Sequence, residues 1–442
     1  MDNNNIIQYL EHNKFLIMQI FNYIRQNSNE QINNYLQPII NCLNQIDNNM
    51  NYIMNLINKN NFAINNNIFD KNDNNIKINN NKNIEKKTNI DDNFLYKDFE
   101  TYFPLIRLKN IGSISYMNSI LQCLLHIPEL NGFFINKYPE QKNQFKKINN
   151  DIYTKGRLCE EFHKIVLGIY KAQKNNNVSP KDFNNFLNQI NAQLGEVDEK
   201  DFLSYLFQIM HAELNYLGDQ KLKKVPKCNQ LIERESFNYF MNMTNNLNLS
   251  IISYLFYGVL KSQIICNVCK SIAYDYQFFQ FLNFPTFKYK DKNFNIYQGF
   301  MDFIKPNLMS GDNKCYCQKC KGLRDMKIAT KIYSTPPYLI IYIDYGINKK
   351  YIPKVVNFGG IIDITEFVDE SNKYGYILYK LIIVCSLIRK SGSSGYYITY
   401  CQNNGNLWYE FNDLSVTETE FNKVNSYSPK ILIYKKIDRI NI

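Results

Sequence analysis

Two short cysteine pairs place the strongest constraint on how this 442-residue chain can fold. Cys266 and Cys269 form one Cys-x-x-Cys knuckle, and Cys317 and Cys320 form a second knuckle after 47 intervening residues. Each knuckle can direct two thiolates at one metal ion, and two knuckles complete the tetrahedral four-thiolate site that zinc favours. The pattern therefore predicts that two distant segments of the chain meet at one structural zinc ion.

Two alternatives to this ligand set remain open. Cys315 lies two residues before Cys317 and is a candidate substitute ligand, although Cys317 and Cys320 have the better knuckle spacing. The second alternative is four reduced, partly buried cysteines without a metal. A catalytic zinc ion is not expected, because such a site keeps an open position and usually has a histidine ligand, and no histidine follows His211.

The overall composition indicates a large folded protein rather than a small secreted disulfide scaffold. Hydrophobic residues make up 45%, which is enough for a substantial core, and eleven cysteines are few for a chain of this length. The first residues lack the pattern of a secretory signal, and the longest apolar run, 376–388, contains Lys380 and is too short to cross a bilayer. We expect a soluble intracellular protein, cytoplasmic or nuclear, without a membrane partner.

The formal net charge of +11 is the one bulk feature that suggests nucleic acid as a partner. The lysines are scattered along the chain, however, and the densest cluster lies in a loop-like stretch at Lys221, Lys223, Lys224 and Lys227. We therefore interpret the charge as solvated surface, and nucleic acid is not an expected partner.

The first hundred residues divide into two compositionally different segments. Residues 1–58 carry apolar residues at helical spacing, such as Ile6, Leu10 and Ile20, which predicts a segment of two or three amphipathic helices. Residues 59–97 are rich in Asn and Lys and poor in aromatics, which predicts a disordered linker. Because so long a polar tether follows the helices, we expect them to bind a protein partner, with packing against the remaining domain as the alternative.

The composition of a folded domain returns in residues 98–437. Helical patterns come first, at 119–125, 160–172 and 202–214, and strand patterns rich in Ile, Tyr and Phe follow, at 338–345, 377–386, 396–401 and 431–434. Helices followed by strands favour an α+β fold.

Residues 108–122 read Leu-Lys-Asn-Ile-Gly-Ser-Ile-Ser-Tyr-Met-Asn-Ser-Ile-Leu-Gln. This segment resembles the nucleophile box of the ubiquitin-specific proteases, whose pattern is Gly-Leu-x-Asn-Leu-Gly-Asn-Thr-Cys-Tyr-Met-Asn-Ser-x-Leu-Gln. Asn110, Gly112 and the run 116–119 match that pattern. Ser115 stands where the family has its cysteine nucleophile. Asn110 stands where a side-chain amide helps to stabilise the oxyanion.

Two further boxes near the C-terminus follow the same family. Gly395-Tyr396-Tyr-Ile-Thr-Tyr resembles the family's Gly-His-Tyr-x-Ala-Tyr and places Tyr396 at the position of the general base. Residues 408–416, Trp-Tyr-Glu-Phe-Asn-Asp-Leu-Ser-Val, resemble the segment that orients the base and place Asn412 at that position. Weaker matches lie at 198–203, and at 336–343, where Asp344-Tyr-Gly replaces the family's Lys-Arg-Phe.

The resemblance covers about three-quarters of the chain, with its boxes in family order. It implies a papain-like cysteine-protease fold of the ubiquitin-specific protease type, with thumb, palm and zinc-binding fingers, preceded here by the helical N-terminal segment. The two cysteine knuckles match the fingers, where the family's zinc is structural. The implied catalytic positions are Asn110, Ser115, Tyr396 and Asn412, and the implied activity is cysteine-type ubiquitinyl hydrolysis.

The residue types at these positions predict that this chemistry fails. A serine hydroxyl needs a neighbouring base to become a nucleophile, and a tyrosine with a reference pKa of about 10 is a poor base at neutral pH. The four histidines, His12, His126, His163 and His211, all precede the box that should carry the base. Of these, His126 and His211 are each expected to be a packing or surface residue.

Three functions follow from the resemblance, in order of preference. The first is a catalytically inactive homologue, a pseudo-deubiquitinase, that binds ubiquitin or a ubiquitinated protein or scaffolds a complex. The second is an active deubiquitinase with atypical catalytic residues. The third, which the altered strand at Asp344 favours, is an assembly scaffold without ubiquitin affinity, as in splicing or RNA-processing complexes.

Overall fold

The computed structural model describes a set of segments that all belong to the second of two compact units, Asn89–Ile442. These segments are 105–110, 115–172, 177–190, 199–218, 233–245, 249–346, 352–372, 375–389, 395–403, 405–413, 415–425 and 428–437. The predicted helical segment 1–58 and linker 59–97 lie outside the described residues, as do His12, Asp198 and the lysines at 221–227. Among the described residues, no helix is long and apolar enough to cross a membrane.

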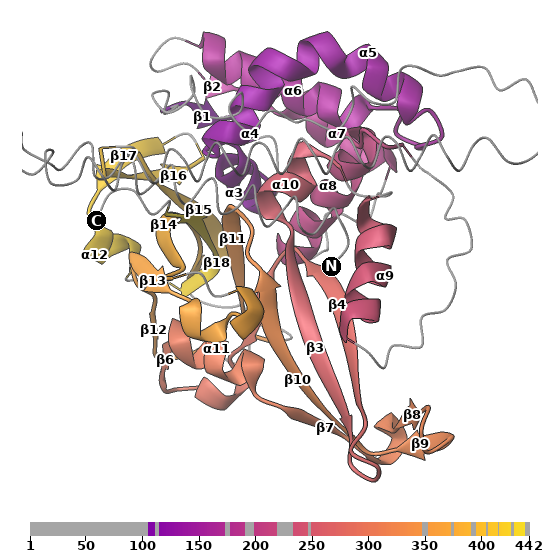
Figure 1. Ribbon diagram of the computed structural model, residues 1–442. Helices are drawn as coiled ribbons and strands as arrows, with labels where there is room; N and C mark the ends of the chain where they lie inside the picture. The colour runs from indigo at the N-terminus through magenta and orange to yellow at the C-terminus, as the bar shows by residue number, and fades with distance from the viewer. Residues whose placement is uncertain are drawn as a thin grey trace, which may run out of the picture. The chain divides into compact units, whose positions relative to one another are not determined.

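The first half of the described chain forms a helical layer (Figure 1). Its members are α3 (Ser115–Leu125), α4 (Pro128–Gly132) with a π-helical turn (Phe133–Lys137), α5 (Tyr138–Ile148), α6 (Arg157–Lys171), α7 (Lys181–Ile190), α8 (Glu199–Glu213) and α10 (Ile251–Phe256). The helix α9 (Glu233–Asn245) instead packs on the strand β4 (Ile272–Phe279), with the rings of Phe240 and Phe278 5.0 Å apart. A two-stranded pair, β1 (Arg107–Leu108) and β2 (Asn177–Val178), joins the entry segment to this layer. The layer corresponds to the expected thumb.

A buried carboxylate joins two of these helices. The first turn of any helix leaves backbone N–H groups without partners inside the helix. In α6, the N–H groups of Leu158 and Cys159 donate to Glu213 of α8, at 3.1 and 2.7 Å. Glu213 is almost fully buried, and this burial raises the pKa of its carboxyl group. The contact fixes the end of α6 against α8.

The second half of the chain forms an eight-stranded sheet, the expected palm. Seven strands lie in the order β17 (Ser415–Thr419), β16 (Trp408–Asn412), β15 (Gly395–Gln402), β14 (Leu378–Arg389), β18 (Ser428–Lys436), β11 (Tyr338–Asp344) and β5 (Leu282–Pro285), and β13 (Ile361–Asp363) pairs with β14. All pairs are antiparallel except β5 with β11.

The sheet is covered on both faces, and the pleat of β11 divides its side chains between two cores. Tyr338, Ile340 and Tyr342 join the core shared with the helical layer. Leu339, Ile341 and Ile343 join the core on the opposite face, which includes residues of α11 (Ile296–Ile304). An uninterrupted apolar strand is therefore what this central position requires.

A second sheet, the expected fingers, extends away from the palm (Figure 1). Its strands are β4 (Ile272–Phe279), β3 (Gly258–Cys266), β10 (Met326–Ser334) and β7 (Asn307–Met309), in that order. The hairpin of β8 (Cys315–Cys317) and β9 (Gly322–Arg324) lies at its far end, beside a small core of Cys266, Cys317 and Met326. The remaining elements, β6 (Asn293–Asn295) paired with β12 (Val355–Asn357) and the short helix α12 (Phe421–Val424), flank the palm.

The seven elements expected from the sequence are all present, with boundaries shifted by a few residues. The largest difference is α3, which begins at Ser115 rather than at residue 119. The sequence pattern marks only the apolar part of this helix, whereas the polar residues of the nucleophile box form its first turn.

Candidate functional site

The N-terminus of α3 carries the central residue of the predicted site. Ser115 is the first residue of this helix, and Tyr116 packs edge-on against Phe202 of α8, with ring centroids 5.3 Å apart. From Met117 onward every residue of α3 is buried, polar residues included. The helix is therefore held rigidly between the helical layer and the palm sheet.

Amide side chains of the nucleophile box connect α3 to the segment that precedes it. Gln122 donates through Nε2 to the carbonyl of Ile106 at 3.2 Å, and Asn118 lies with Nδ2 3.5 Å from the carbonyl of Lys109. Both amides are nearly fully buried. These motif residues thus position Asn110, which follows directly in the same segment.

An aspartate that the sequence interpretation did not single out joins these groups from the palm. Asp413 follows β16 and has a left-handed backbone, with φ of 48°. Its carboxylate accepts a hydrogen bond from Asn110 Nδ2 at 2.9 Å, and Asn118 Nδ2 lies 3.4 Å from its other oxygen. A left-handed conformation is costly for most residues but is tolerated by Asp and Asn. The two amides therefore hold the turn after Asn412 against the start of α3.

The palm strand β15 reaches the same place from a different direction. Thr399 of β15 donates through Oγ1 to the carbonyl of Ser119 in α3, at 2.9 Å. In the sheet, Thr399 is paired with Phe411 of β16. Because β15 and β16 are antiparallel, Tyr396 and Asn412 both lie beyond this pair, toward the same end of the sheet. We call this meeting point of α3, residues 105–110 and the ends of β15 and β16 the α3 junction.

The two tyrosines at the start of β15 have different environments. Tyr397 is buried in the core that contains α3. Tyr396 is partly buried and packs against the core on the opposite face, with Ile398 and Tyr400 of the same strand among that core's members. The ring of Tyr396 therefore contributes to packing of the palm.

The side chain of His126 makes structural contacts just beyond the C-terminal end of α3. Its Nδ1 lies 2.7 Å from the carbonyl of Gln122, and its ring packs against Phe411, with centroids 4.5 Å apart. It lies eleven residues beyond Ser115, roughly 16 Å along an α-helix at 1.5 Å per residue. His126 is therefore remote from the first turn of α3.

The other two described histidines belong to the helical layer. His163 packs against Tyr138 at 5.2 Å between centroids, and burial lowers the pKa of its ring. His211 lies with Nδ1 2.7 Å from Ser250 Oγ, and Ser250 is the fully buried N-cap of α10. His211 thus has the packing role that was expected from the sequence.

A buried charged pair lies close to Tyr116. Lys430 of β18 is only 2% exposed, lies 3.8 Å from the carboxylate of Glu199 and donates to the hydroxyl of Tyr342 at 2.8 Å. Its ammonium also lies over the ring of Tyr345, 5.1 Å from the centroid. Burial, and then the Glu199 carboxylate, raise the pKa of the Tyr116 hydroxyl. The positive charge of Lys430 and the negative charge of Glu199 thus compensate each other inside the core near the α3 junction.

The four predicted cysteine ligands meet at the far end of the fingers. The sulfurs of Cys266, Cys269, Cys317 and Cys320 all lie within 4.8 Å of one another, and this set excludes Cys315. Two sulfur pairs are separated by 3.9 and 3.6 Å. Four ligands at 2.3 Å from a tetrahedral zinc ion are separated by about 3.8 Å. The four cysteines can therefore bind a metal ion.

Ser271 is a further polar residue of this cluster, and nothing in the spacing of the knuckles pointed to it. Its hydroxyl oxygen lies 3.0 Å from the sulfur of Cys269 and 3.6 Å from that of Cys317. The hydrogen bond from Ser271 lowers the pKa of the Cys269 thiol to about 6, so this ligand is available as a thiolate near neutral pH.

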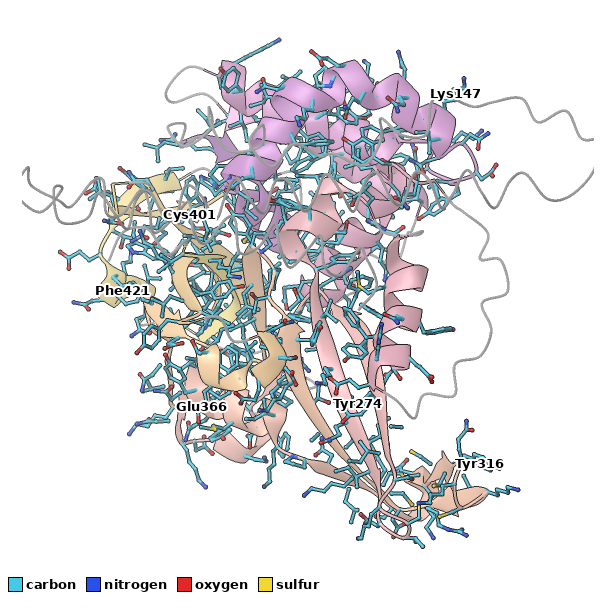
Figure 2. The ribbon with its side chains drawn as sticks, viewed as in Figure 1. Lys147, Tyr274, Tyr316, Glu366, Cys401 and Phe421 are labelled. Carbon is cyan, nitrogen blue, oxygen red and sulfur yellow. The ribbon has the colours of Figure 1, made fainter. Side chains whose placement is uncertain are left out.

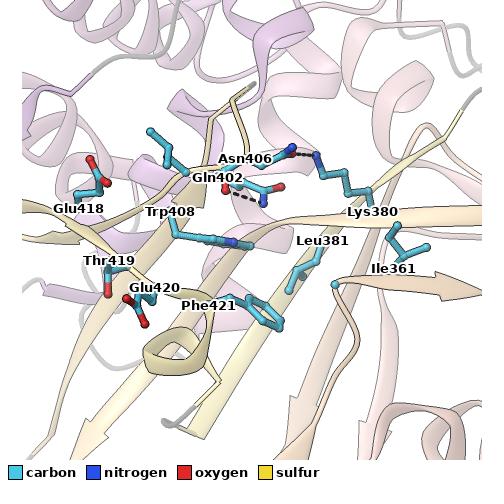
Figure 3. Close-up of a pocket in the computed structure, with 12 residues that line it drawn as sticks. Ile361, Lys380, Leu381, Gln402, Asn406, Trp408, Glu418, Thr419, Glu420 and Phe421 are labelled. Carbon is cyan, nitrogen blue, oxygen red and sulfur yellow. Dashed lines mark hydrogen bonds between the residues drawn. The ribbon is translucent and has the colours of Figure 1, made fainter. Parts of the chain in front are cut away.

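A pocket of about 520 Å³ lies on the palm, at the opposite end of β15 and β16 from Tyr396 and Asn412 (Figure 3). Trp408, Leu381 and Phe421 line it with apolar surface. Lys380, which also lines the pocket, donates a hydrogen bond to the side chain of Asn406. It lies in the notch where β14 changes partner from β13 to β15. The pocket is therefore separate from the α3 junction.

Comparison with known proteins places this architecture in a family. The model of the ubiquitin carboxyl-terminal hydrolase family matches residues 106–434, so the chain belongs to that family. Its fold is the papain-like fold of the ubiquitin-specific proteases. The structure of the yeast SAGA DUB module superposes with a TM-score of 0.56 at 21% identity, covering 77% of this chain and 70% of that chain. The SAGA DUB module bound to ubiquitin aldehyde gives 0.55 at 22%, covering 77% and 71%.

Curated relatives carry the same family name. Ubiquitin carboxyl-terminal hydrolase 2 of Homo sapiens is 26% identical over 342 residues, covering 75% of this chain and 55% of the relative. Ubiquitin carboxyl-terminal hydrolase 4 of Vanderwaltozyma polyspora is 26% identical over 375 residues, covering 75% and 41%. This chain spans about half the length of these curated relatives.

Proposed function

We propose that this chain is a catalytically inactive member of the family, a pseudo-deubiquitinase that binds ubiquitin or scaffolds a complex around it. The observation that carries the proposal is the pair Ser115 and Tyr396, which occupy the positions of nucleophile and general base in the matching boxes. A hydroxyl nucleophile requires a base to accept its proton, and a phenol does not serve that purpose at neutral pH.

The surroundings of the α3 junction support this proposal. The three described histidines make contacts elsewhere, so none of them substitutes for the missing base. Asn110, which stands at the oxyanion position, donates its amide to Asp413. With nucleophile and base both changed, only the residual contribution of substrate binding and oxyanion stabilisation would remain.

Ubiquitin is the proposed partner because solved structures with the same fold were determined with ubiquitin species. One SAGA DUB module was solved bound to ubiquitin aldehyde and another bound to monoubiquitin, each with several subunits. Fingers and palm present a surface that does not depend on a thiol nucleophile. The four-cysteine cluster is proposed to hold a structural zinc ion, because all four donors are sulfurs and leave no open coordination position.

A scaffold without ubiquitin affinity is the second candidate. It is favoured by the segment after β11, where Tyr345 is fully buried beside Lys430 in place of the family's basic residue. Asp344-Tyr-Gly stands where the family has Lys-Arg-Phe, so these three positions of the palm have an acidic residue and no basic residue.

The experiment combines a cleavage assay with a binding assay on the full chain. We expect no fluorophore release from a C-terminal ubiquitin conjugate, no labelling by a ubiquitin vinyl-sulfone probe, and measurable binding of monoubiquitin. Turnover that disappears in the Ser115→Ala variant would contradict the inactive assignment and support an atypical enzyme. Failure to bind ubiquitin, with no turnover, would leave the scaffold function instead.

A further inference from the structure

The far end of the fingers is strongly basic. We define the fingertip as residues 267–271 and 312–327, the two knuckle turns with the β8–β9 hairpin. It contains six cations and two carboxylates, a net charge of +4: Lys270, Lys314, Lys319, Lys321, Arg324 and Lys327 against Asp312 and Asp325. A zinc ion with four thiolates would add a formal charge of about −2, which leaves the fingertip positive.

Most of these cations have no carboxylate partner within the described part of the chain. Lys314 lies 3.9 Å from Asp325, and this is the fingertip's one ion pair there. Lys270, Lys319, Lys321 and Lys327 are exposed. Unpaired exposed cations on a small surface attract a polyanion, because the charge is not cancelled locally.

Exposed apolar side chains lie among the cations. Val268 is 65%, Tyr316 61% and Leu323 60% exposed, and Tyr316 faces Leu323 across the β8–β9 register. Figure 2 shows Tyr316 at the extremity of the fingers. A ring or aliphatic side chain this exposed offers a stacking face to a base. The fingertip thus combines cations for phosphates with apolar faces for bases.

The backbone of the knuckles places two of the lysines in equivalent positions. Lys270 and Lys321 each follow the second cysteine of a knuckle, and both have left-handed backbones, with φ of 58° and 52°. Glycine is the residue that this conformation favours, so a lysine there costs stability. Each knuckle nevertheless carries a lysine directly after a cysteine of the same sulfur cluster.

We propose that the fingertip binds single-stranded nucleic acid, with its lysines on the phosphates and a base stacked on Tyr316. A single strand fits better than a duplex, because its unpaired bases can stack on an exposed ring such as Tyr316, whereas the bases of a duplex are already stacked on one another. The sequence did not suggest this partner because the lysines come from two segments that only the fold brings together.

The test is fluorescence anisotropy of the full, metal-containing chain with labelled oligo-U and oligo-dT of about 15 nucleotides, at several salt concentrations. The key variant combines Lys270→Gly, Lys319→Gln and Lys321→Gly. Glycine suits the left-handed positions, so this variant keeps the knuckles folded while it removes three charges. We expect binding to weaken by about tenfold or more, and the log–log salt slope to fall by about 2.

The control variant combines Lys147→Gln, Lys171→Gln and Lys181→Gln in the helical layer, which removes the same charge from a distant surface. It should weaken binding less than about twofold, whereas Tyr316→Ser should weaken it about tenfold. Equal losses in the two triple variants would overturn the proposal, since total charge would then explain the binding. Binding of a poly-glutamate peptide but of neither oligonucleotide would also overturn it and indicate an acidic protein partner.

Discussion

The fingertip and the α3 junction differ in how well their side chains suit the site that their backbone elements form. At the fingertip the backbone and the side-chain chemistry agree, because four sulfurs converge at separations that suit one metal ion. At the α3 junction the elements meet as in the family fold, but Ser115 begins the helix, the ring of Tyr396 packs on the opposite face of the sheet, and the Asn110 amide is paired with Asp413. If the proposed loss of activity holds, assembly of a site and its chemical competence are separable properties.

The comparison also separates two kinds of stability. The fingertip has a core of only three buried residues, so we expect its stability to depend on a metal ion held by its four cysteines. The α3 junction lies within the largest hydrophobic cluster and is held by helix and sheet packing. Damage at the fingertip should therefore be severe but local, whereas damage near the α3 junction should lower the stability of the whole domain.

The largest effect is expected for Cys317→Ser. Loss of one of four thiolates should abolish stoichiometric metal binding, and the apparent free energy of a structural zinc site is about 10 kcal/mol or more. Elemental analysis should give less than one metal ion per chain, and the β8–β9 hairpin should lose protection in hydrogen exchange while β11 and β18 keep theirs. Cys315→Ser is the matched control, because that cysteine lies outside the cluster and should leave the metal in place. Full metal content in Cys317→Ser would contradict the four-cysteine site.

The next effect is expected for Lys430→Met, below the α3 junction. This change leaves Glu199 buried without its cation, which should cost about 3–5 kcal/mol of the free energy of unfolding. The double variant with Glu199→Gln should recover a large part of that loss, because neither residue then carries a buried charge. Urea unfolding of the two single variants and the double variant gives the interaction free energy between Lys430 and Glu199. Additive losses would show that the pair does not act as a unit.

A smaller effect is expected for Asp413→Ala, which removes the acceptor shared by Asn110 and Asn118. The cost should be about 1–2 kcal/mol, measured by urea unfolding. Asp413→Gly serves as the control, since glycine accepts a φ of 48° at little cost and removes only the carboxylate. If the two variants are equally destabilised, backbone strain at this turn contributes nothing.

The contrast between the two regions also explains what the sequence could predict. The knuckles are local patterns, so their spacing predicted which four cysteines lie together, whereas the fold showed that Cys315 lies outside this set. The contact between Asn110 and Asp413 joins residues 303 positions apart, and no local pattern marks it. The same holds for Lys430 with Glu199.

The secondary structure was likewise predictable where a local pattern determines it and not where tertiary contacts do. Apolar strands such as β11 and β14 were predictable because both their faces are buried, which makes the apolar run continuous. The start of α3 was missed because its first turn is largely polar and makes tertiary contacts, including the packing of Tyr116 on Phe202 and the contact of Asn118 with Asp413. Tertiary packing thus determined the element boundary that matters most for the site.

The smallest effect is expected for restoring the reactive pair, with Ser115→Cys and Tyr396→His together. The fold already places α3 and β15 at one junction, so a thiol and an imidazole would occupy the family positions. The new imidazole would have to leave the packing that Tyr396 now makes on the opposite face, and the Asn110 amide would still be paired with Asp413. We therefore expect only trace release of fluorophore from a ubiquitin conjugate, absent from either single variant. The combination of Ser115→Ala with Tyr396→His is the control and should be silent. Equal turnover in Ser115→Cys alone would show that position 396 is not the base, and full family-like activity would show that the α3 junction had lost nothing but two side chains.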